Sequence, residues 1–443
     1  MENCYPFALP DDVTVEYGQV NACIEYPTVS GSCDGLTFPV CDIRQHGDLA
    51  VVLGLKTRRE PDRFIKTICR AETQDGISYS NEQELFSLPD PDHKWLAGNV
   101  IAVSDQRCIA MICDMGRPPT SGHRFHVFTG NIDGSDWHQA NSEPVYKGQD
   151  SFSLRWDGRQ IVNYATSYQN YSKRFPDNMG DQIRRVFHIR TSPDGLAWTP
   201  GGSFGVDGPL LPDDQLIVPD EKDPEETEFY KFSTFTYFGF HVGIMVKYIS
   251  QPEEVPGLEG WPHGPMLSAE YWISRDGFTW LRPYDRNDAR LESLPRSFNY
   301  SLTQPYITPH RLRWNRGQRI LDVPRYRLLG IGCRANASII TPPLHLSGTP
   351  LRLHVSFQSE QRKRQDMFRQ GYVMVDLLDQ NRQVIHGFEG AKCLFTDCRA
   401  NILPLCWEGQ NLSSIAENQP VHFRIRFRDA RIYTLEGAVE ISD

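Results

Sequence analysis

Short apolar runs separated by turn-forming residues make up most of the chain. The runs at residues 50–55, 107–113 and 240–246 are rich in β-branched, aromatic and other apolar side chains. Such residues suit the pleated, half-buried surface of a strand. Glycine, proline, aspartate and asparagine recur between the runs, and these residues form tight turns. The pattern predicts an all-β fold.

One phrase recurs along this pattern. Residues 192–198 read Ser-Pro-Asp-Gly-Leu-Ala-Trp, residues 274–280 repeat the phrase, and weaker copies stand at 131–137 and 73–79. Asp-Gly between two apolar runs indicates a two-residue hairpin, because glycine accepts the positive φ that the turn demands. Four copies indicate a repeated sheet unit, and the first three are spaced like the blades of a propeller. The aspartates of the four copies are assigned to turns: Asp75, Asp133, Asp194 and Asp276.

A fifth unit follows without the Asp-Gly pair, with strands expected at residues 300–306 and 326–332. Five units of roughly 60 residues each fit a five-bladed β-propeller, at slightly more than common blade lengths. From about residue 341 apolar and polar residues alternate, as in antiparallel strands with one face on a core, which predicts a β-sandwich. The predicted domains are a propeller at 41–344 and a sandwich at 345–443, with residues 1–40 packing on the propeller or closing its ring.

Composition excludes several classes of partner. The net charge is −10 and the basic residues are scattered, so no nucleic-acid partner is expected. The acidic balance also argues mildly against a strongly polyanionic substrate, although a local arginine cluster can override net charge. No apolar run reaches the roughly 18 residues of a membrane span, so no membrane association is expected. The sequence leaves the oligomeric state open, including a homo-oligomer.

The cysteines and the start of the chain bear on location. The chain begins without a basic segment followed by an apolar one, so a cytoplasmic protein is expected, or a secreted one if a leader was removed. Eleven cysteines are an odd number, several lie in apolar runs, and no Cys-x-x-Cys pair occurs. They are predicted to be reduced thiols. No metal ion or other cofactor is predicted.

The repeated phrase and the C-terminal region together resemble a known group. Ser-x-Asp-Gly-x-x-Trp units followed by Val-Asp-Leu-Leu-Asp and Ile-x-Gly-Phe within 375–388 resemble the five-bladed β-propeller glycoside hydrolases similar to families 32 and 43. The opening Trp-x-Asn-Asp-Pro-Asn-Gly of family 32 is absent, which argues against fructoside specificity. The resemblance implies a hydrolase, a glycosidase of carbohydrate metabolism that removes a terminal, furanosidic sugar from a small carbohydrate substrate.

Candidate catalytic residues follow from the propeller geometry. The first strand of each blade lines the central channel, so residues at successive strand starts converge there. Paired carboxylates are the usual groups for glycoside cleavage, and Asp42, Asp150 and Glu228 fall at equivalent places. The resemblance to family 43 implies a base at Asp42, an orienting group at Asp150 and an acid at Glu228, with Glu226 as the alternative acid. Asp48 is a rival to Asp42, and each carboxylate could instead cap a turn or face solvent.

Further residues are predicted to contact the substrate. Arg155 and Trp156 alternate along the third inner strand, so only one of them is expected to face the channel. The candidates for substrate binding are His93, Trp95, Arg155, Glu226, Tyr230, Gln304 and Tyr306, with Trp261 and His263 at the rim.

Two other functions remain open at this stage. A propeller polysaccharide lyase acting on a uronate-containing glycan could use His93, Arg155 and Tyr230, and its products would absorb ultraviolet light. A non-catalytic glycan-binding propeller would lack two acids within reach of one glycosidic bond. The fold alone does not choose among them.

Overall fold

The computed structural model describes most of the chain. It covers residues 4–440 except 26, 61–63, 90–94, 115–122, 149–150, 171–182, 203–210, 225–226, 250–266, 284–303, 317–318, 348–349, 358–370, 397–398, 411, 413–414 and 416–418. Within these residues helical structure is limited to short 3-10 turns such as η1 (Pro10–Asp12). The prediction of an all-β fold is confirmed. No helix of the described part is long and apolar enough to cross a membrane.

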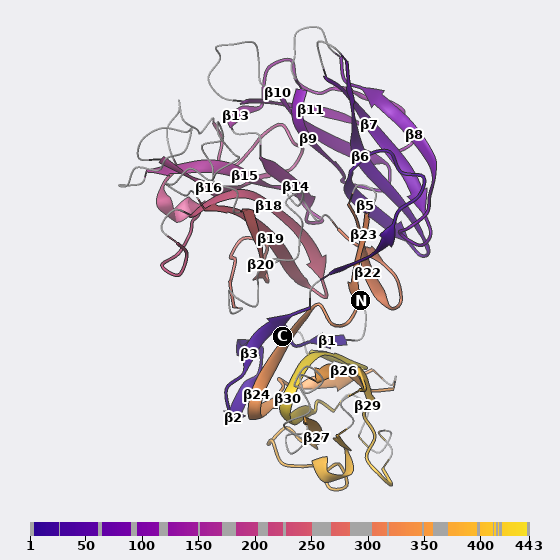
Figure 1. The fold of residues 1–443 in the computed structure, drawn as a ribbon, viewed down its shortest axis with the longest axis vertical. Helices are drawn as coiled ribbons and strands as arrows, with labels where there is room; N and C mark the ends of the chain where they lie inside the picture. Colours follow the sequence, from indigo (N-terminus) through magenta and orange to yellow (C-terminus); the bar gives the residue numbers. More distant parts are fainter. Residues whose placement is uncertain are drawn as a thin grey trace, which may run out of the picture.

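Five sheets form a propeller, which is the upper body in Figure 1. The inner strands follow one another around the ring: β5 contacts β9, β9 contacts β14, β14 contacts β18, and β21 contacts β5. Two glutamine amides complete the ring. Gln304 joins the fifth blade to Thr236 of β18, and Gln45 of β5 joins it to Ile307 of β21. The predicted five-bladed arrangement is confirmed.

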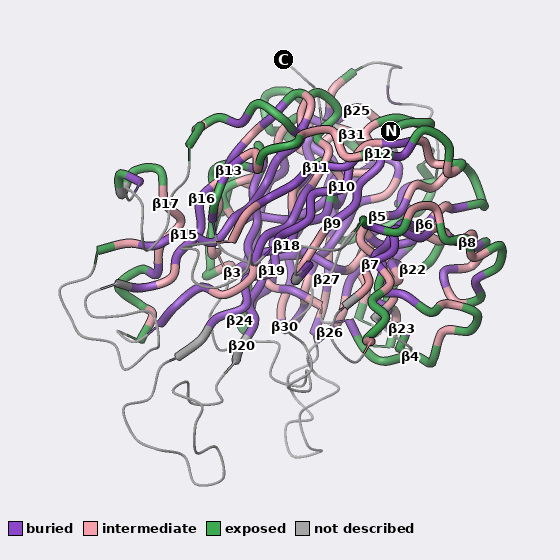
Figure 2. Tube along the Cα trace, turned by 90° about the horizontal axis from the view of Figure 1, so that it is seen from above, coloured by how far each residue is buried: buried purple, intermediate pink, exposed green. Residues whose placement is uncertain are grey.

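The strands of the blades are as follows. The first blade holds β5 (Val40–His46), β6 (Leu49–Arg59), β7 (Phe64–Thr73) and β8 (Tyr79–Ser87); the second β9 (Trp95–Ala102), β10 (Arg107–Asp114), β11 (His123–Asn131), β12 (His138–Gln139) and β13 (Tyr146–Gly148); the third β14 (Phe152–Trp156), β15 (Ile161–Asn170), β16 (Ile183–Ser192) and β17 (Leu216–Ile217); the fourth β18 (Thr227–Tyr237), β19 (Phe240–Ile249) and β20 (Leu267–Ser274). Strands such as β10 are buried, whereas the outer strand β8 is largely exposed (Figure 2).

The start of the chain completes the fifth blade. This blade contains β21 (Tyr306–Ile307), β22 (Arg311–Arg316) and β23 (Arg319–Pro324), and β4 (Thr28–Ser32) pairs antiparallel with β23 as its outer strand. Residues near both ends of the propeller sequence therefore share one sheet. The strand expected at 326–332 does not belong to this blade, because β24 (Leu329–Ile340) pairs instead with β30 (His422–Glu436) in the lower body.

The repeated phrase forms turns as predicted, but these turns are longer than the expected two-residue hairpin, because Thr73 pairs with Tyr79, Thr191 with Thr199 and Ile273 with Leu281. Oδ1 of Asp194 accepts hydrogen bonds from the backbone N–H groups of Leu196 and Ala197 at 2.8 and 3.1 Å. The Ser192 hydroxyl oxygen accepts from the N–H of Gly195, whose φ of +85° suits glycine. Asp75 and Asp276 make the corresponding pairs of bonds to Ile77 and Ser78 and to Phe278 and Thr279. Their assignment to turns is confirmed.

The lower body in Figure 1 is built around one nine-stranded sheet. Its central strand β30 pairs with β24, β26 (Arg352–Phe357) and β27 (Tyr372–Leu378). Its other strands are β1 (Cys4–Pro6), β2 (Thr14–Tyr17), β3 (Asn21–Ile24), β28 (Leu394–Phe395) and β29 (Ile402–Pro404), and β25 (Leu344–Leu346) pairs separately with β31 (Ala438–Glu440). The two-layer sandwich and the domain limits stay predictions.

An apolar cluster joins the two bodies. Ala22 and Ile24 of β3 pack with Phe235 and Tyr237 of β18 in one buried group. The backbone N–H of Leu328 also donates to the Tyr237 hydroxyl at 3.3 Å. The fourth blade is therefore fixed to the lower sheet.

Candidate functional site

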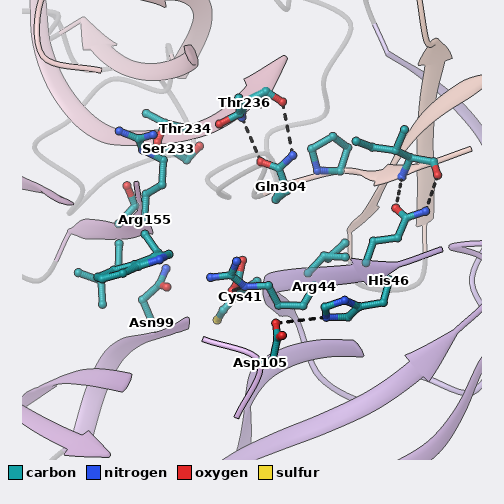
Figure 3. A pocket seen from close by; sticks show the side chains of 18 residues that line it. Cys41, Arg44, His46, Asn99, Asp105, Arg155, Ser233, Thr234, Thr236 and Gln304 are labelled. Atoms are coloured by element: carbon teal, nitrogen blue, oxygen red, sulfur yellow. Dashed lines mark hydrogen bonds and ion pairs between the residues drawn. The ribbon is translucent and has the colours of Figure 1, made fainter. Parts of the chain in front are cut away.

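A cavity of about 400 Å³ lies where the inner strands of the propeller meet (Figure 3). Residues from β5, β9, β14, β18 and the segment that leads into β21 line it, so all five blades contribute. Cys41 to His46 cover nearly all of β5 and Ser153 to Trp156 most of β14, whereas Ser233, Thr234 and Thr236 lie in the second half of β18. The cavity therefore borders β5 and β14 along most of their length, and its volume is at the lower end of the range for ligand pockets.

Asp42 on β5 lines the cavity, and its side chain is only 16% exposed. Oδ2 accepts a hydrogen bond from the backbone N–H of Ala102 at 2.9 Å and lies 3.5 Å from Nε of Arg44. Burial raises the pKa of Asp42 to about 6, although the charge of Arg44 and the bond from Ala102 act in the opposite direction. The carboxyl group is thus mostly ionised at neutral pH and can still exchange a proton there.

Arg44 holds this carboxylate in place. Its Nη2 donates to the carbonyl oxygen of Ala102, the same residue whose N–H binds Asp42. The pair thus connects the inner strands of the first and second blades. The sequence interpretation missed Arg44, although a residue two positions after Asp42 on a strand shares its face.

Arg155 lies at the opposite side of the cavity, on β14. Its Nη1 donates to Nδ1 of His241 at 2.8 Å. Burial and the Arg155 charge lower the pKa of His241 to about 4, so this histidine is neutral at pH 7. Arg155 and Trp156 both border the cavity, and which of the two side chains faces the channel stays a prediction.

Gln304 and Tyr306 lie in different surroundings. Gln304 lines the cavity, and its amide accepts from Thr236 N–H at 3.0 Å and donates to Thr236 O at 3.4 Å. Tyr306 is buried, and its hydroxyl donates toward the carbonyl oxygens of Asp48 and Gln74. Tyr306 thus packs the fifth blade against the first and does not line the cavity.

Trp95 is buried between the first two blades. It is 1% exposed, its Nε1 donates to Pro89 O at 3.1 Å, and it packs with Ile68 and Phe128. It does not line the cavity, and its role in substrate binding stays a prediction.

Glu228 lies near the start of β18 and is fully buried. It is 3.4 Å from the backbone nitrogen of Arg185 and 3.6 Å from that residue's Nη1. Phe232, four residues further along, accepts a hydrogen bond from the cavity residue Ser153. At the usual rise per residue of a strand, Glu228 lies about 13 Å along β18 from Phe232, the residue level with the cavity. The ring of Tyr230 lies 5.9 Å from the Arg185 guanidinium. Neither Glu228 nor Tyr230 lines the cavity.

The remaining predicted residues cannot be placed. Asp150, His93 and Glu226, and Trp261 and His263 of the predicted rim, lie outside the described residues. A grouping of three or more His, Cys, Asp or Glu side chains suited to a metal ion does not occur in the described part.

Neutral polar side chains complete the lining. Asn99, Ser153, Ser233 and Thr234 come from three different inner strands and are nearly buried. Amides and hydroxyls of this kind donate to and accept from sugar hydroxyl groups. The sequence interpretation missed these residues, and their polarity within otherwise apolar strands was the available indication.

Comparisons with known proteins give a distant result. No protein-family model and no curated protein matches the chain. Among solved structures, a glycosyl hydrolase from Bacteroides ovatus is 12% identical, with 73% of this chain and 98% of that chain covered and a TM-score of 0.40. An α-L-arabinanase from Penicillium chrysogenum, complexed with arabinobiose, is 11% identical over 71% and 82%, with a TM-score of 0.36. A glycoside hydrolase family 43 β-1,3-galactosidase is 10% identical over 68% and 94%, with a TM-score of 0.38. At this distance the likeness assigns no activity to this chain.

Proposed function

We propose that this chain is a glycoside hydrolase that removes a terminal sugar in the propeller channel, with Asp42 as one of its two catalytic carboxyl groups. The observation that carries the proposal is the Asp42 carboxyl group, nearly buried in a polar cavity to which all five blades contribute. A pKa of about 6 is suited to proton transfer near neutral pH. The furanosidic form of the sugar rests on the resemblance of the sequence alone.

The proposed chemistry needs two carboxyl groups. Asp42, in its ionised form, takes a proton from water as the water oxygen bonds to the anomeric carbon. A second carboxyl group protonates the leaving oxygen as the glycosidic bond breaks. The resemblance assigns this second group to Glu228, with Glu226 as the alternative, and the orientation of the substrate to Asp150. Because Glu228 is buried outside the cavity lining, it can act as the acid only when the channel opens as far as its level.

The direct test is hydrolysis of a panel of 4-nitrophenyl furanosides and pyranosides by the wild-type chain and by Asp42→Asn. Loss of general base catalysis should reduce kcat by about 10²–10⁴-fold. Asp48→Asn is the matched control, because Asp48 is an exposed carboxylate in the turn just after β5. If Asp42→Asn keeps its activity and Asp48→Asn loses it, the role of the base would be reassigned to Asp48.

Other outcomes identify the other functions. A product of a natural glycan that absorbs ultraviolet light and contains a new double bond would indicate a lyase. Tight glycan binding without cleavage, unchanged by Asp42→Asn, would indicate a binding module. Either result would refute the proposed hydrolase.

A further inference from the structure

The charge of the described cavity lining is opposite to the charge of the chain. The whole chain carries −10. Among the described residues of the lining, Arg44 and Arg155 occur with one shielded carboxylate, Asp42. The other acid of the lining, Asp105, is 86% exposed and lies 3.6 Å from the exposed His46. The described part of the inner wall therefore carries two positive charges and one negative charge, and such a local excess attracts anions regardless of net charge.

Arg44 has donors available for a ligand. A guanidinium group has five N–H bonds. Among the described residues, the hydrogen bond to Ala102 O uses one of them, and Nε lies 3.5 Å from Asp42. The side chain is 32% exposed, and Figure 3 shows it among the residues that surround the middle of the cavity.

Arg155 contributes charge rather than donors. Its Nη1 is bonded to His241, and its Nη2 packs beside Gly277, where a Cβ atom would come within 2.5 Å. Burial shields Nη2 and Nε from solvent. The two arginines thus differ: Arg44 can bind a ligand directly, and Arg155 supplies a fixed positive charge across the cavity.

We propose that the sugar bound in this cavity is acidic, as in a uronic acid, and that Arg44 binds its carboxylate. This inference rests on the proposed function and specifies the substrate class of that site. The planar guanidinium matches the two oxygens of a carboxylate better than the single hydroxyls of a neutral sugar.

The test uses pairs of 4-nitrophenyl glycosides that differ only in the carboxylate: glucuronide with glucoside and galacturonide with galactoside, in both anomers. The binding of free glucuronate, galacturonate, glucose and galactose is measured by calorimetry. We expect at least one acidic member to be preferred to its neutral partner by about 10-fold or more, as for a gained charge-assisted hydrogen bond. Raising the salt from about 0.05 to 0.5 M should weaken binding of the acidic member only.

Variants then identify the residue responsible. Arg44→Gln should lower the acidic-to-neutral preference by about 10- to 100-fold, and Arg44→Lys should retain part of it. The ratio isolates the carboxylate contact, because any effect of Arg44 on Asp42 is common to both members of a pair. Arg159→Gln is the matched control, since Arg159 is an exposed arginine of the turn after β14 and does not line the cavity.

The outcomes separate this inference from the proposed function. Cleavage with equal or greater preference for the neutral member of every pair would overturn the acidic substrate and leave the hydrolase in place. Arg44-dependent binding of an acidic sugar without cleavage would support the acidic ligand and refute the hydrolase. Absence of binding to every acidic sugar would overturn the inference. If Arg44→Gln does not fold, the wild-type preference and its salt dependence decide the question.

Discussion

Replacing Asp42 by Asn should stabilise the protein at neutral pH while it removes activity. Asp42 is only 16% exposed, and burial raises its pKa from the ordinary 3.8 to about 6. Folding therefore favours the protonated form. Asn resembles that form, and its side-chain oxygen can still accept the hydrogen bond from Ala102. The variant should therefore avoid the cost of holding a buried negative charge.

The size and pH range of this effect follow from the shift. A difference of about 2 pKa units corresponds to about 3 kcal/mol. The pKa of Asp42 is higher in the folded protein than in the unfolded chain. The contribution of Asp42 to the free energy of unfolding is therefore most favourable below about pH 4, where the group is protonated in both states. The contribution is lost as the pH rises through about 6. Asp42→Asn should thus equal the wild type in free energy of unfolding near pH 4 and exceed it by up to about 3 kcal/mol at pH 8.

Thermal and urea unfolding between pH 4 and pH 8 would measure the difference. Asp48→Asn removes the same charge from an exposed turn and should stay within about 0.5 kcal/mol of the wild type throughout. A variant that is less stable than the wild type at pH 8 would refute the reasoning. The reasoning would also be refuted if the difference in free energy of unfolding between Asp42→Asn and the wild type did not grow between pH 5 and pH 7. Such a result would show that Asp42 does not titrate in that range.

Four other predictions concern different parts of the chain. Glu228→Gln should reduce hydrolysis of natural glycosides by about 10²–10⁴-fold and that of substrates with good leaving groups much less; equal losses on both would exclude Glu228 as the acid. Val29→Pro should remove a backbone donor where β4 pairs with Leu321 of β23 and should lower the melting temperature, whereas the control Val29→Thr should not. Equal melting temperatures for the two variants would refute a stabilising role for β4. Thiol titration of the denatured, unreduced protein should count close to eleven cysteines, and two or more disulfides would contradict the prediction. Burial alone would raise the pKa of Asp276, but hydrogen bonds from its turn hold that pKa at about 2. The contribution of Asp276 to the free energy of unfolding should therefore be present above pH 3.8 and fall toward pH 2. Asp276→Asn should lack this fall, and a variant with the same dependence of stability on acid pH as the wild type would contradict the prediction.

The propeller could be predicted from the sequence because each blade is a local structure. Strand, turn and returning strand lie within one stretch of chain, so Asp-Gly turns between apolar runs are sufficient to find them. The pairing of β4 with β23 could not be predicted in this way. Thr28 faces Asp322 across almost 300 residues, and no local pattern specifies a partner at that separation. The same reason explains why β24 was expected in the fifth blade.

The candidate site was predictable only in part. The rule that inner strands line the channel found Asp42, Arg155 and Gln304, which all border the cavity. It did not specify how far along the channel a residue lies. Trp95 and Glu228 also stand near strand starts, but both are buried away from the cavity lining. Alternation along a strand gives the face of a side chain, whereas its depth in the channel depends on the tilt and stagger of the neighbouring blades.

The repeated turns also fix neighbouring blades to one another. The hydroxyl of Tyr164 in the third blade donates to the carbonyl oxygen of Gly277, in the turn of the fourth, at 2.8 Å. In the same way, Tyr306 of the fifth blade donates to Gln74 O, beside the turn of the first blade, at 2.6 Å. A Cβ atom at Gly195 in the third blade would contact Ile109 of the second. Each of these turns therefore packs against the blade that precedes it around the ring.

This arrangement explains why the strongest motif of the sequence carries no chemistry. A ring of similar blades presents the same neighbour contact several times, so the residues that make this contact recur. Binding one asymmetric substrate requires a different group from each blade. The inner strands do supply different groups to the cavity, with Asp42 from the first blade, Asn99 from the second and Ser233 from the fourth. In this propeller, repetition therefore indicates residues that hold the ring together, and the positions at which the blades differ are where catalytic residues should be sought.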